Sequence, residues 1–246
     1  MYRIAVPKFP GASGAEDVVY AYSSVIGDVE AYTVAPEAER LGKPDAVIIP
    51  GGYSFGDYLR PGGLAKTCRV SGAIKKFARD GGPILGVGNG FQILCELDLL
   101  PGALIINYST SFMNEQAYIK VASNLCPFTK HLAEEKVLRM PISCYYGAFF
   151  ADPRTLRELE QDDHIAFRYC NHLGDTDDPI GFNGSLNSIA GIISRHGNVM
   201  GMMPHPERAV EAVRGGTDGL AVLSSVLIPD SNPESAQSAD GPSEST

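Results

Sequence analysis

The sequence predicts an α/β fold in which a central, mostly parallel sheet is flanked by helices and carries a small antiparallel extension. In the first half of the 246 residues, apolar runs of strand length alternate with segments of helical spacing. These runs are continuously apolar, which is typical of parallel strands covered on both faces. In the second half the runs are shorter and follow one another through turns, which indicates antiparallel strands.

The first half predicts four strands and three helices. Residues 45–50, DAVIIP, form a continuous apolar run that ends at two glycines, as a buried strand does. Residues 63–80 have the spacing of an amphipathic helix, with Ala73, Ile74 and Phe77 on its inward face. The expected strands are 3–6, 29–34, 45–50 and 84–85, and the expected helices are 15–26, 63–80 and 91–99.

The second half predicts the antiparallel extension, one further apolar strand, a last helix and a tail. The expected strands are 117–121, 137–144, 164–169, 188–194 and 199–203, and the expected helix is 216–228. From residue 229 the chain has no aromatic residue, no aliphatic residue larger than alanine, and four acids without a base. Such a segment cannot bury enough surface to offset its ordering entropy. We therefore expect a folded domain over 1–228 and a disordered, acidic Ser/Pro tail over 229–246.

Composition excludes several classes of function. The net charge of −9 argues against a nucleic-acid-binding protein, because contacts to phosphates need a basic surface. No apolar run is long enough to span a membrane, and the N-terminus reads as a first strand and not as a signal peptide. The five cysteines and five histidines are scattered without metal-ligand spacing. We expect a cytoplasmic protein with reduced thiols, no metal and no cofactor of its own.

Residues 83–94, PILGVGNGFQIL, read as a strand, a tight turn and the start of a helix. This is the shape of a nucleophile elbow, in which a strained turn presents a reactive side chain at the edge of an α/β sheet. The position of that side chain is Gly88, which has none. Gly86, Gly88 and Gly90 also resemble a degraded dinucleotide-binding loop, but such a loop should follow the first strand, where the pattern is absent.

Two other strand ends carry candidate site residues. Gly51 and Gly52 follow the buried strand 45–50, and paired glycines there can point backbone N–H groups at a developing negative charge. Taken alone, such a loop more often only turns the chain. After the strand 199–203, His205 stands between two prolines and two residues before Glu207, so the two side chains can form a base and its orienting carboxylate. The alternative is a surface histidine in a turn.

Together these segments resemble the class I glutamine amidotransferase subunits of phosphoribosylformylglycinamidine synthase, which act in purine biosynthesis. The resemblance implies a class I amidotransferase-like, flavodoxin-like fold. It covers nearly all of the expected domain, and the two segments most specific to this subfamily are VIIPGGYSFGDYLRPGGLA and GNVMGMMPHPERA. The other matching segments are KFPG, PILGVGNGFQIL, LLPGALIIN, GAFFAD, AFRY and NGSLNSIAGI.

The resemblance implies that a cysteine thiolate at the elbow attacks the side-chain amide of glutamine and forms a glutamyl thioester, which water hydrolyses. By position, His205 matches the family's base and Glu207 its orienting residue. The oxyanion and substrate-binding positions carry over to Gly51, Gly52, Asn89 and Gln92. The implied partners are the large synthetase subunit, which uses ATP and Mg²⁺ and receives the ammonia, and a small accessory subunit.

This chain departs from the family pattern at several positions around one pocket. Gly88 replaces the nucleophilic cysteine, and covalent catalysis needs a nucleophilic atom. Residues 141–147, PISCYYG, stand where the family has Ile-Ala-His-Gly-Glu-Gly, and Ser13-Gly14 stand near its early Ser-Asn-Cys. Two hypotheses follow. Either a displaced thiol, Cys144, still hydrolyses glutamine, or the chain is a catalytically inactive scaffold or regulatory subunit that binds the synthetase. Cys95 is expected to be a core residue.

Overall fold

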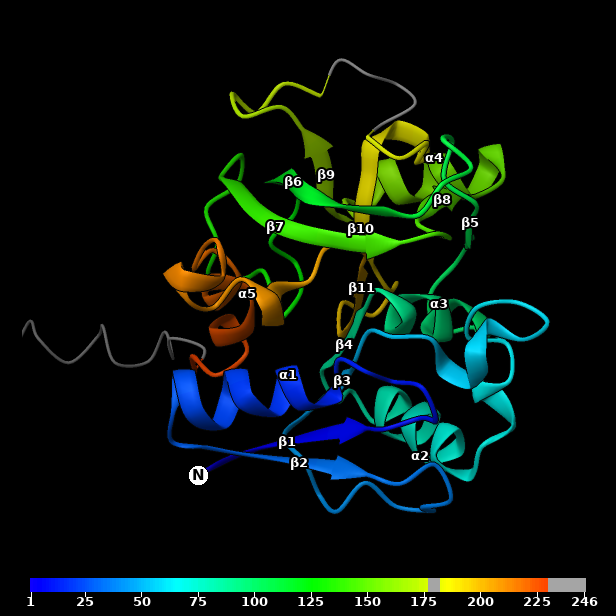
Figure 1. The fold of residues 1–246 in the computed structure, drawn as a ribbon, viewed down its shortest axis with the longest axis vertical. Helices are drawn as coiled ribbons and strands as arrows, with labels where there is room; N and C mark the ends of the chain where they lie inside the picture. The colour runs from blue at the N-terminus through cyan, green and yellow to red at the C-terminus, as the bar shows by residue number, and fades with distance from the viewer. Residues whose placement is uncertain (177–181, 230–246) are drawn as a thin grey trace, which may run out of the picture.

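The computed structural model of the protein describes residues 1–176 and 182–229 (Figure 1). One sheet of nine strands runs through it, in the order β2-β1-β3-β4-β11-β10-β9-β6-β7. Neighbouring strands are parallel from β2 to β11 and antiparallel from β11 to β7. The strands are β1 (Tyr2–Pro7), β2 (Val29–Val34), β3 (Ala46–Ile49), β4 (Ile84–Val87), β6 (Met113–Val121), β7 (Val137–Cys144), β9 (Ile165–Cys170), β10 (Ile189–Ile193) and β11 (Val199–Met202).

The predicted fold class is confirmed. The antiparallel extension comprises the four strands from β10 to β7, and a separate two-stranded sheet pairs β5 (Ala103–Ile105) with β8 (Ala148–Phe150). Every residue of β3 and β4 is buried, which is why their sequences are continuously apolar. The order β2-β1-β3-β4-β11 is that of flavodoxin-like sheets, whose ligands bind outside the carboxyl ends of the strands.

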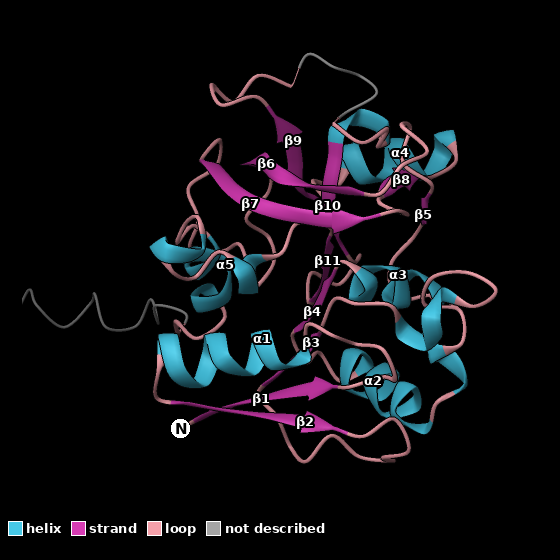
Figure 2. Cartoon of the chain, in the orientation of Figure 1, coloured by secondary structure: helices cyan, strands magenta, loops and turns pink. Residues whose placement is uncertain are grey.

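Helices cover both faces of the parallel strands. In Figure 2, α1 (Ala15–Tyr20) and α5 (Gly219–Ser225) lie on one side of β3 and β4, and α2 (Arg69–Arg79) and α3 (Asn89–Glu96) on the other. A wider helical segment, η1 (Ala21–Ile26), continues α1. The hydroxyl of its buried Tyr22 donates a hydrogen bond of 3.1 Å to the Leu223 carbonyl, which joins η1 to α5.

The second predicted helix is shorter than expected. A single 3₁₀ turn (Ala65–Thr67) comes first, Cys68 is extended, and α2 begins only at Arg69. Val70 lies in the first turn of α2, so its N–H has no acceptor within the helix. It donates instead to the Pro36 carbonyl at 3.1 Å. A tertiary contact therefore sets this helix start. The last helix is also shorter than the predicted 216–228.

The helix α4 (Pro153–Gln161) and the strands β5 and β8 were not expected from the sequence. The signal for α4 is its start: Asp152 accepts hydrogen bonds from the N–H groups of Arg154 and Thr155, and Pro153 is the first helical residue. The predicted tail, apart from Pro229, lies outside the described residues.

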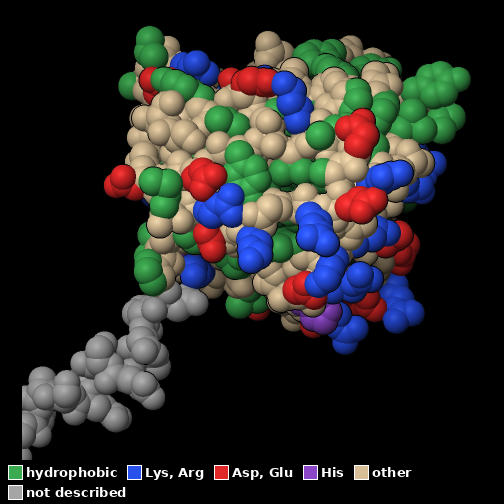
Figure 3. Space-filling model, turned by 90° about the horizontal axis from the view of Figure 1, so that it is seen from below, with side chains coloured by type: hydrophobic (Ala, Val, Ile, Leu, Met, Phe, Trp, Pro, Cys, Tyr) green, Lys and Arg blue, Asp and Glu red, His purple; other side chains and the backbone are tan. Residues whose placement is uncertain are grey.

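The surface around α2 carries charges of both signs. Figure 3 shows basic side chains interspersed with acidic ones on this face. Two of the pairs are Lys76–Asp80 at 2.5 Å and Arg69–Glu39 at 3.1 Å, and all four side chains are largely exposed. Within the described ranges, no helix is long and apolar enough to cross a membrane.

Candidate active site

The turn between β4 and α3 has the geometry of a nucleophile elbow. Gly88 has φ 54° and ψ −110°, a conformation that residues with a side chain adopt only under strain. Its N–H donates to the Met202 carbonyl at 2.8 Å, and its carbonyl accepts from the Phe91 N–H at 3.0 Å. The backbone of the elbow is therefore intact although no side chain projects from it.

Close packing explains the neighbouring glycines of the elbow. A Cβ at Gly90 would overlap the carbonyl oxygen of Ile49 in β3, and a Cβ at Gly86 would lie 2.6 Å from the Gly90 carbonyl oxygen. Both glycines let α3 pack directly against the strands. The pattern G-x-G-x-G thus follows from backbone contacts and needs no phosphate-binding role.

His205 and Glu207 lie directly beside the elbow. His205 is 3% exposed, and its Nδ1 lies 2.7 Å from the Glu207 Oε1, whose side chain is fully buried. Since a carboxylate only accepts, Nδ1 carries the proton and Nε2 of a neutral ring is left free to accept one. Nε2 is buried and has no hydrogen-bond partner among the described residues.

The unpaired nitrogen faces the position where the nucleophile is missing. A Cβ built on Gly88 would lie 3.2 Å from the His205 Nε2 and 3.1 Å from its Cε1. The ring is held in place from its backbone, because the His205 N–H donates to the Pro141 carbonyl of β7 at 2.9 Å. His205 and Glu207 thus have the geometry of a base and its orienting carboxylate, beside a position that has no side chain.

The glycine pair after β3 forms the opposite wall. A Cβ at Gly51 would lie 2.6 Å from the His205 Cε1, so only glycine leaves room for the ring. Gly52 has φ 136°, and a Cβ there would lie 2.5 Å from the Gly11 carbonyl oxygen. Gly14, where the family pattern is lost, supports this loop through the backbone: its N–H donates to the Gly51 carbonyl at 3.0 Å.

Two residues that line the cavity, Gly52 and Asn89, have backbone N–H groups without a hydrogen-bond acceptor among the described residues. Asn89 is the first residue of α3, so its N–H has no acceptor within the helix. The Gly52 N–H donates to no acceptor in the part of the chain that the structure describes. Preorganised donors of this kind, at a helix N-terminus, stabilise negative charge that develops on a carbonyl oxygen.

The side chains of Asn89 and Gln92 hold the loops around the site. Asn89 Oδ1 accepts from the Ser54 N–H at 3.0 Å, and its Nδ2 donates to Gln92 Oε1 at 2.8 Å. Gln92 Nε2 in turn donates to the Tyr146 carbonyl at 2.7 Å. Both predicted residues are therefore at the site, where their side chains join α3 to two loops.

The cavity beside His205 is small. It encloses about 20 Å³, which is room for about one water molecule. Its lining includes the predicted residues Gly52, Asn89, Gln92 and His205, and residues of the altered segment 141–147. Tyr53, Asp57 and Met203 also line it and were not predicted as site residues. A cleft of about 680 Å³ shares Gln92 and Tyr146 with it. A cavity of this size is too small to enclose an amino-acid side chain such as that of glutamine.

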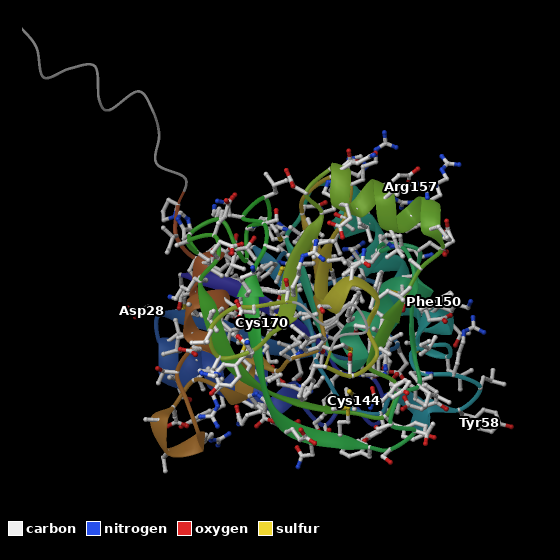
Figure 4. All side chains as sticks on the ribbon, turned by 90° about the horizontal axis from the view of Figure 1, so that it is seen from above. Asp28, Tyr58, Cys144, Phe150, Arg157 and Cys170 are labelled. Carbon is white, nitrogen blue, oxygen red and sulfur yellow. The ribbon has the colours of Figure 1, made fainter. Side chains whose placement is uncertain are left out.

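Cys144 lines the same cavity but is a poor nucleophile. Cys144 is the last residue of β7 (Figure 4) and is 6% exposed. It packs so closely on Gly147 that a Cβ at Gly147 would overlap the Cys144 sulfur. Burial raises the pKa of the Cys144 thiol to about 11, so it is neutral at pH 7. Burial also raises the pKa of Cys95, whose side chain packs against the core, as expected, at the border of the cleft.

We expect Cys144→Ser to leave glutamate release from glutamine unchanged, because a neutral thiol packed against the backbone does not attack an amide. The measurement is an enzyme-coupled glutamate assay on both proteins at equal concentration. Release by the unmodified chain that Cys144→Ser abolishes, while Cys68→Ser retains it, would instead identify a displaced nucleophile.

The described residues hold no group of three His, Cys, Asp or Glu side chains that could bind a metal ion. The absence of a cofactor from this chain stays a prediction.

Comparison with known proteins agrees with this geometry. Residues 1–217 match the model of the CobB/CobQ-like glutamine amidotransferase domain. The chain is 44% identical over 225 residues to the phosphoribosylformylglycinamidine synthase subunit PurQ of Moorella thermoacetica, covering 92% of this chain and 95% of that protein. PurQ of Aquifex aeolicus is 42% identical over 226 residues, with 92% and 99% covered.

Solved structures give the same result. A chain of PurLQS from Thermotoga maritima superposes with a TM-score of 0.80 at 36% identity, covering 92% of this chain and 97% of that one. The glutaminase domain of Trypanosoma brucei CTPS with bound acivicin superposes with a TM-score of 0.60 at 11% identity, which shows a shared fold. The chain therefore belongs to the CobB/CobQ-like glutamine amidotransferases and, within them, to the PurQ subunits of phosphoribosylformylglycinamidine synthase.

Proposed function

We propose that this chain serves phosphoribosylformylglycinamidine synthase as a glutamine-binding subunit that does not itself hydrolyse glutamine at a useful rate. The observation that carries the proposal is the elbow: Gly88 has no side chain, while the His205 Nε2 faces it without a partner. Membership in the PurQ family supports glutamine as the ligand.

The remaining residues can bind and polarise the amide but cannot complete its cleavage. The Gly52 and Asn89 N–H groups would donate hydrogen bonds to the carboxamide oxygen, and His205, oriented by Glu207, would place its Nε2 as a proton acceptor beside the reacting carbon. Without a nucleophilic atom no thioester forms. Sites that lose the nucleophile of a triad keep roughly 10³–10⁴-fold catalysis over water, which is far below a useful rate.

The proposed partners are the large synthetase subunit and a small accessory subunit. Support comes from the likeness to the PurQ relatives and to PurLQS. ATP and Mg²⁺ belong to the synthetase, and this chain uses no cofactor of its own. In such a complex it would scaffold the synthetase, gate the entry of ammonia, or leave the synthetase to use free ammonia.

We expect the chain to bind glutamine and to co-purify with the synthetase subunit while releasing glutamate no faster than a blank. The measurements are calorimetric titration with glutamine, size-exclusion chromatography of the mixed subunits, and the coupled glutamate assay, each with and without the synthetase. Glutamate release at an ordinary enzymatic rate would contradict the loss of activity. A chain that binds neither glutamine nor the synthetase would contradict the binding role.

A further inference from the structure

The loop after β3 turns back over the site through a strained backbone. Three consecutive residues, Phe55, Gly56 and Asp57, have left-handed φ values of 55°, 65° and 54°. Side-chain-bearing residues adopt this conformation at a cost, and such strain gathers at binding and catalytic sites. The Phe55 N–H donates to the Pro10 carbonyl at 2.7 Å, which holds the loop in this shape. The consequence is that the Asp57 side chain lines the cavity.

The Asp57 carboxylate has no cation beside it. The Asn89 Nδ2 donates a long hydrogen bond of 3.5 Å to the Asp57 Oδ1. No Lys, Arg or His of the described residues lies within ion-pair distance of the Asp57 carboxylate. Residues 177–181 and 230–246 contain no Lys, Arg or His. Partial burial without a compensating charge raises the pKa of Asp57 to about 6. Burying a carboxylate costs free energy unless a positively charged group pairs with it, so a cationic ligand would be favoured here.

The cavity wall holds no second group of this kind. Among the described residues that line it, Asp57 is the one carboxylate, and no lysine or arginine lines it. A glutamine whose carboxamide lies between Gly52 and Asn89 carries a positively charged α-ammonium group at its other end. We infer that Asp57 is the anchor for the α-ammonium group of the amino-acid ligand. This inference rests on the proposed binding of glutamine.

The assignment explains how the site would select its ligand. A charged hydrogen bond to Asp57 forms only with a free α-amino group, so the site discriminates against glutamine within a peptide chain and against amides that lack the amine. A site built for a charged partner rejects the analogue without it, because the buried group is then left unpaired. Asp57 is thereby a specificity-determining residue and takes no part in bond cleavage.

The chain offers a matched control for a charge-removing substitution. Asp28 also has φ 54°, and it is exposed, between η1 and β2. Figure 4 places it on the opposite side of the molecule from Tyr58, the neighbour of Asp57. Asn tolerates left-handed backbone as Asp does. Asp57→Asn and Asp28→Asn therefore remove the same charge at residues of the same φ, one near the site and one far from it.

The experiment is calorimetric titration of the unmodified chain, Asp57→Asn and Asp28→Asn, alone and with the synthetase subunit. The two probes are L-glutamine and glutaramic acid, which is glutamine without its α-amino group. We expect Asp57→Asn to weaken glutamine binding about 10- to 100-fold. We expect Asp57→Asn to bind glutaramic acid at least as tightly as the unmodified chain does, and Asp28→Asn to behave as the unmodified chain.

The outcomes separate this inference from the proposed function. Glutamine binding that Asp57→Asn leaves unchanged, or weakening of both probes by the same factor, would overturn the assignment of Asp57 and leave glutamine binding intact. An unmodified chain that binds no glutamine, with or without the synthetase, would overturn both. Circular dichroism of each variant at the titration temperature confirms that the compared proteins are folded.

Discussion

Gly88→Cys is expected to release glutamate from glutamine at least about 10⁴-fold faster than the unmodified chain. Removing the nucleophile from a catalytic unit costs on the order of 10⁴–10⁶ in rate, and restoring it to an otherwise assembled site should recover a comparable factor. The site is assembled in this sense, because the His205 Nε2 is buried, unpaired and 3.2 Å from where the new Cβ would lie.

Two features of the elbow would activate the introduced thiol. It would stand at the N-terminus of α3, where the helix dipole favours a thiolate, and beside the His205 ring, which can accept its proton. The new Cβ contacts are slightly short, so His205 must move by a few tenths of an ångström. The measurement is kcat/KM from the coupled glutamate assay, with and without the synthetase subunit.

Gly88→Ala is the matched control, because it introduces the same Cβ and the same backbone strain without a thiol. Both variants are expected to lose about 1–3 kcal/mol of unfolding free energy, since φ 54° with ψ −110° is unfavourable for any side chain. Gly88 therefore stabilises the fold at the expense of the chemistry. Two folded variants with equal stability and equally absent activity would show that the pocket has changed beyond this one position.

The local parts of the site could be predicted from the sequence. The elbow between β4 and α3 and the pair His205–Glu207 are each contained in a few consecutive residues, so their geometry follows from short-range constraints. The continuously apolar strands β3 and β4 were predictable for a similar reason, because both of their faces are covered.

The parts that could not be predicted depend on distant contacts. The hydrogen bond that joins Gln92 to Tyr146 spans 54 positions, and no local pattern announces it. The direction of Asp57 follows from three left-handed residues in a row, of which only Gly56 is a glycine. Left-handed backbone at residues with side chains results from the surrounding structure and not from their own preference.

Glu207→Gln in the Gly88→Cys protein is expected to lower kcat on the order of 10³–10⁴-fold with little change in KM. The Glu207 carboxylate accepts the proton of His205 Nδ1, which leaves Nε2 free to act as the base. An amide in its place can turn its own N–H toward Nδ1, which moves the ring proton to Nε2 and removes the base. The corresponding exchange in a serine protease costs about 10⁴ in kcat.

Stability distinguishes this positioning role from a structural one. The Glu207 Oε2 is buried without a partner, so replacing the carboxylate by an uncharged amide of the same shape removes a desolvated charge and should cost little unfolding free energy. Glu211→Gln makes the same exchange four residues on, where the side chain pairs with Arg214, and should leave kcat unchanged. If Glu207→Gln kept full activity, or lost activity only together with its folding, the carboxylate would be a packing residue and His205 would be oriented by its backbone hydrogen bond to Pro141 alone.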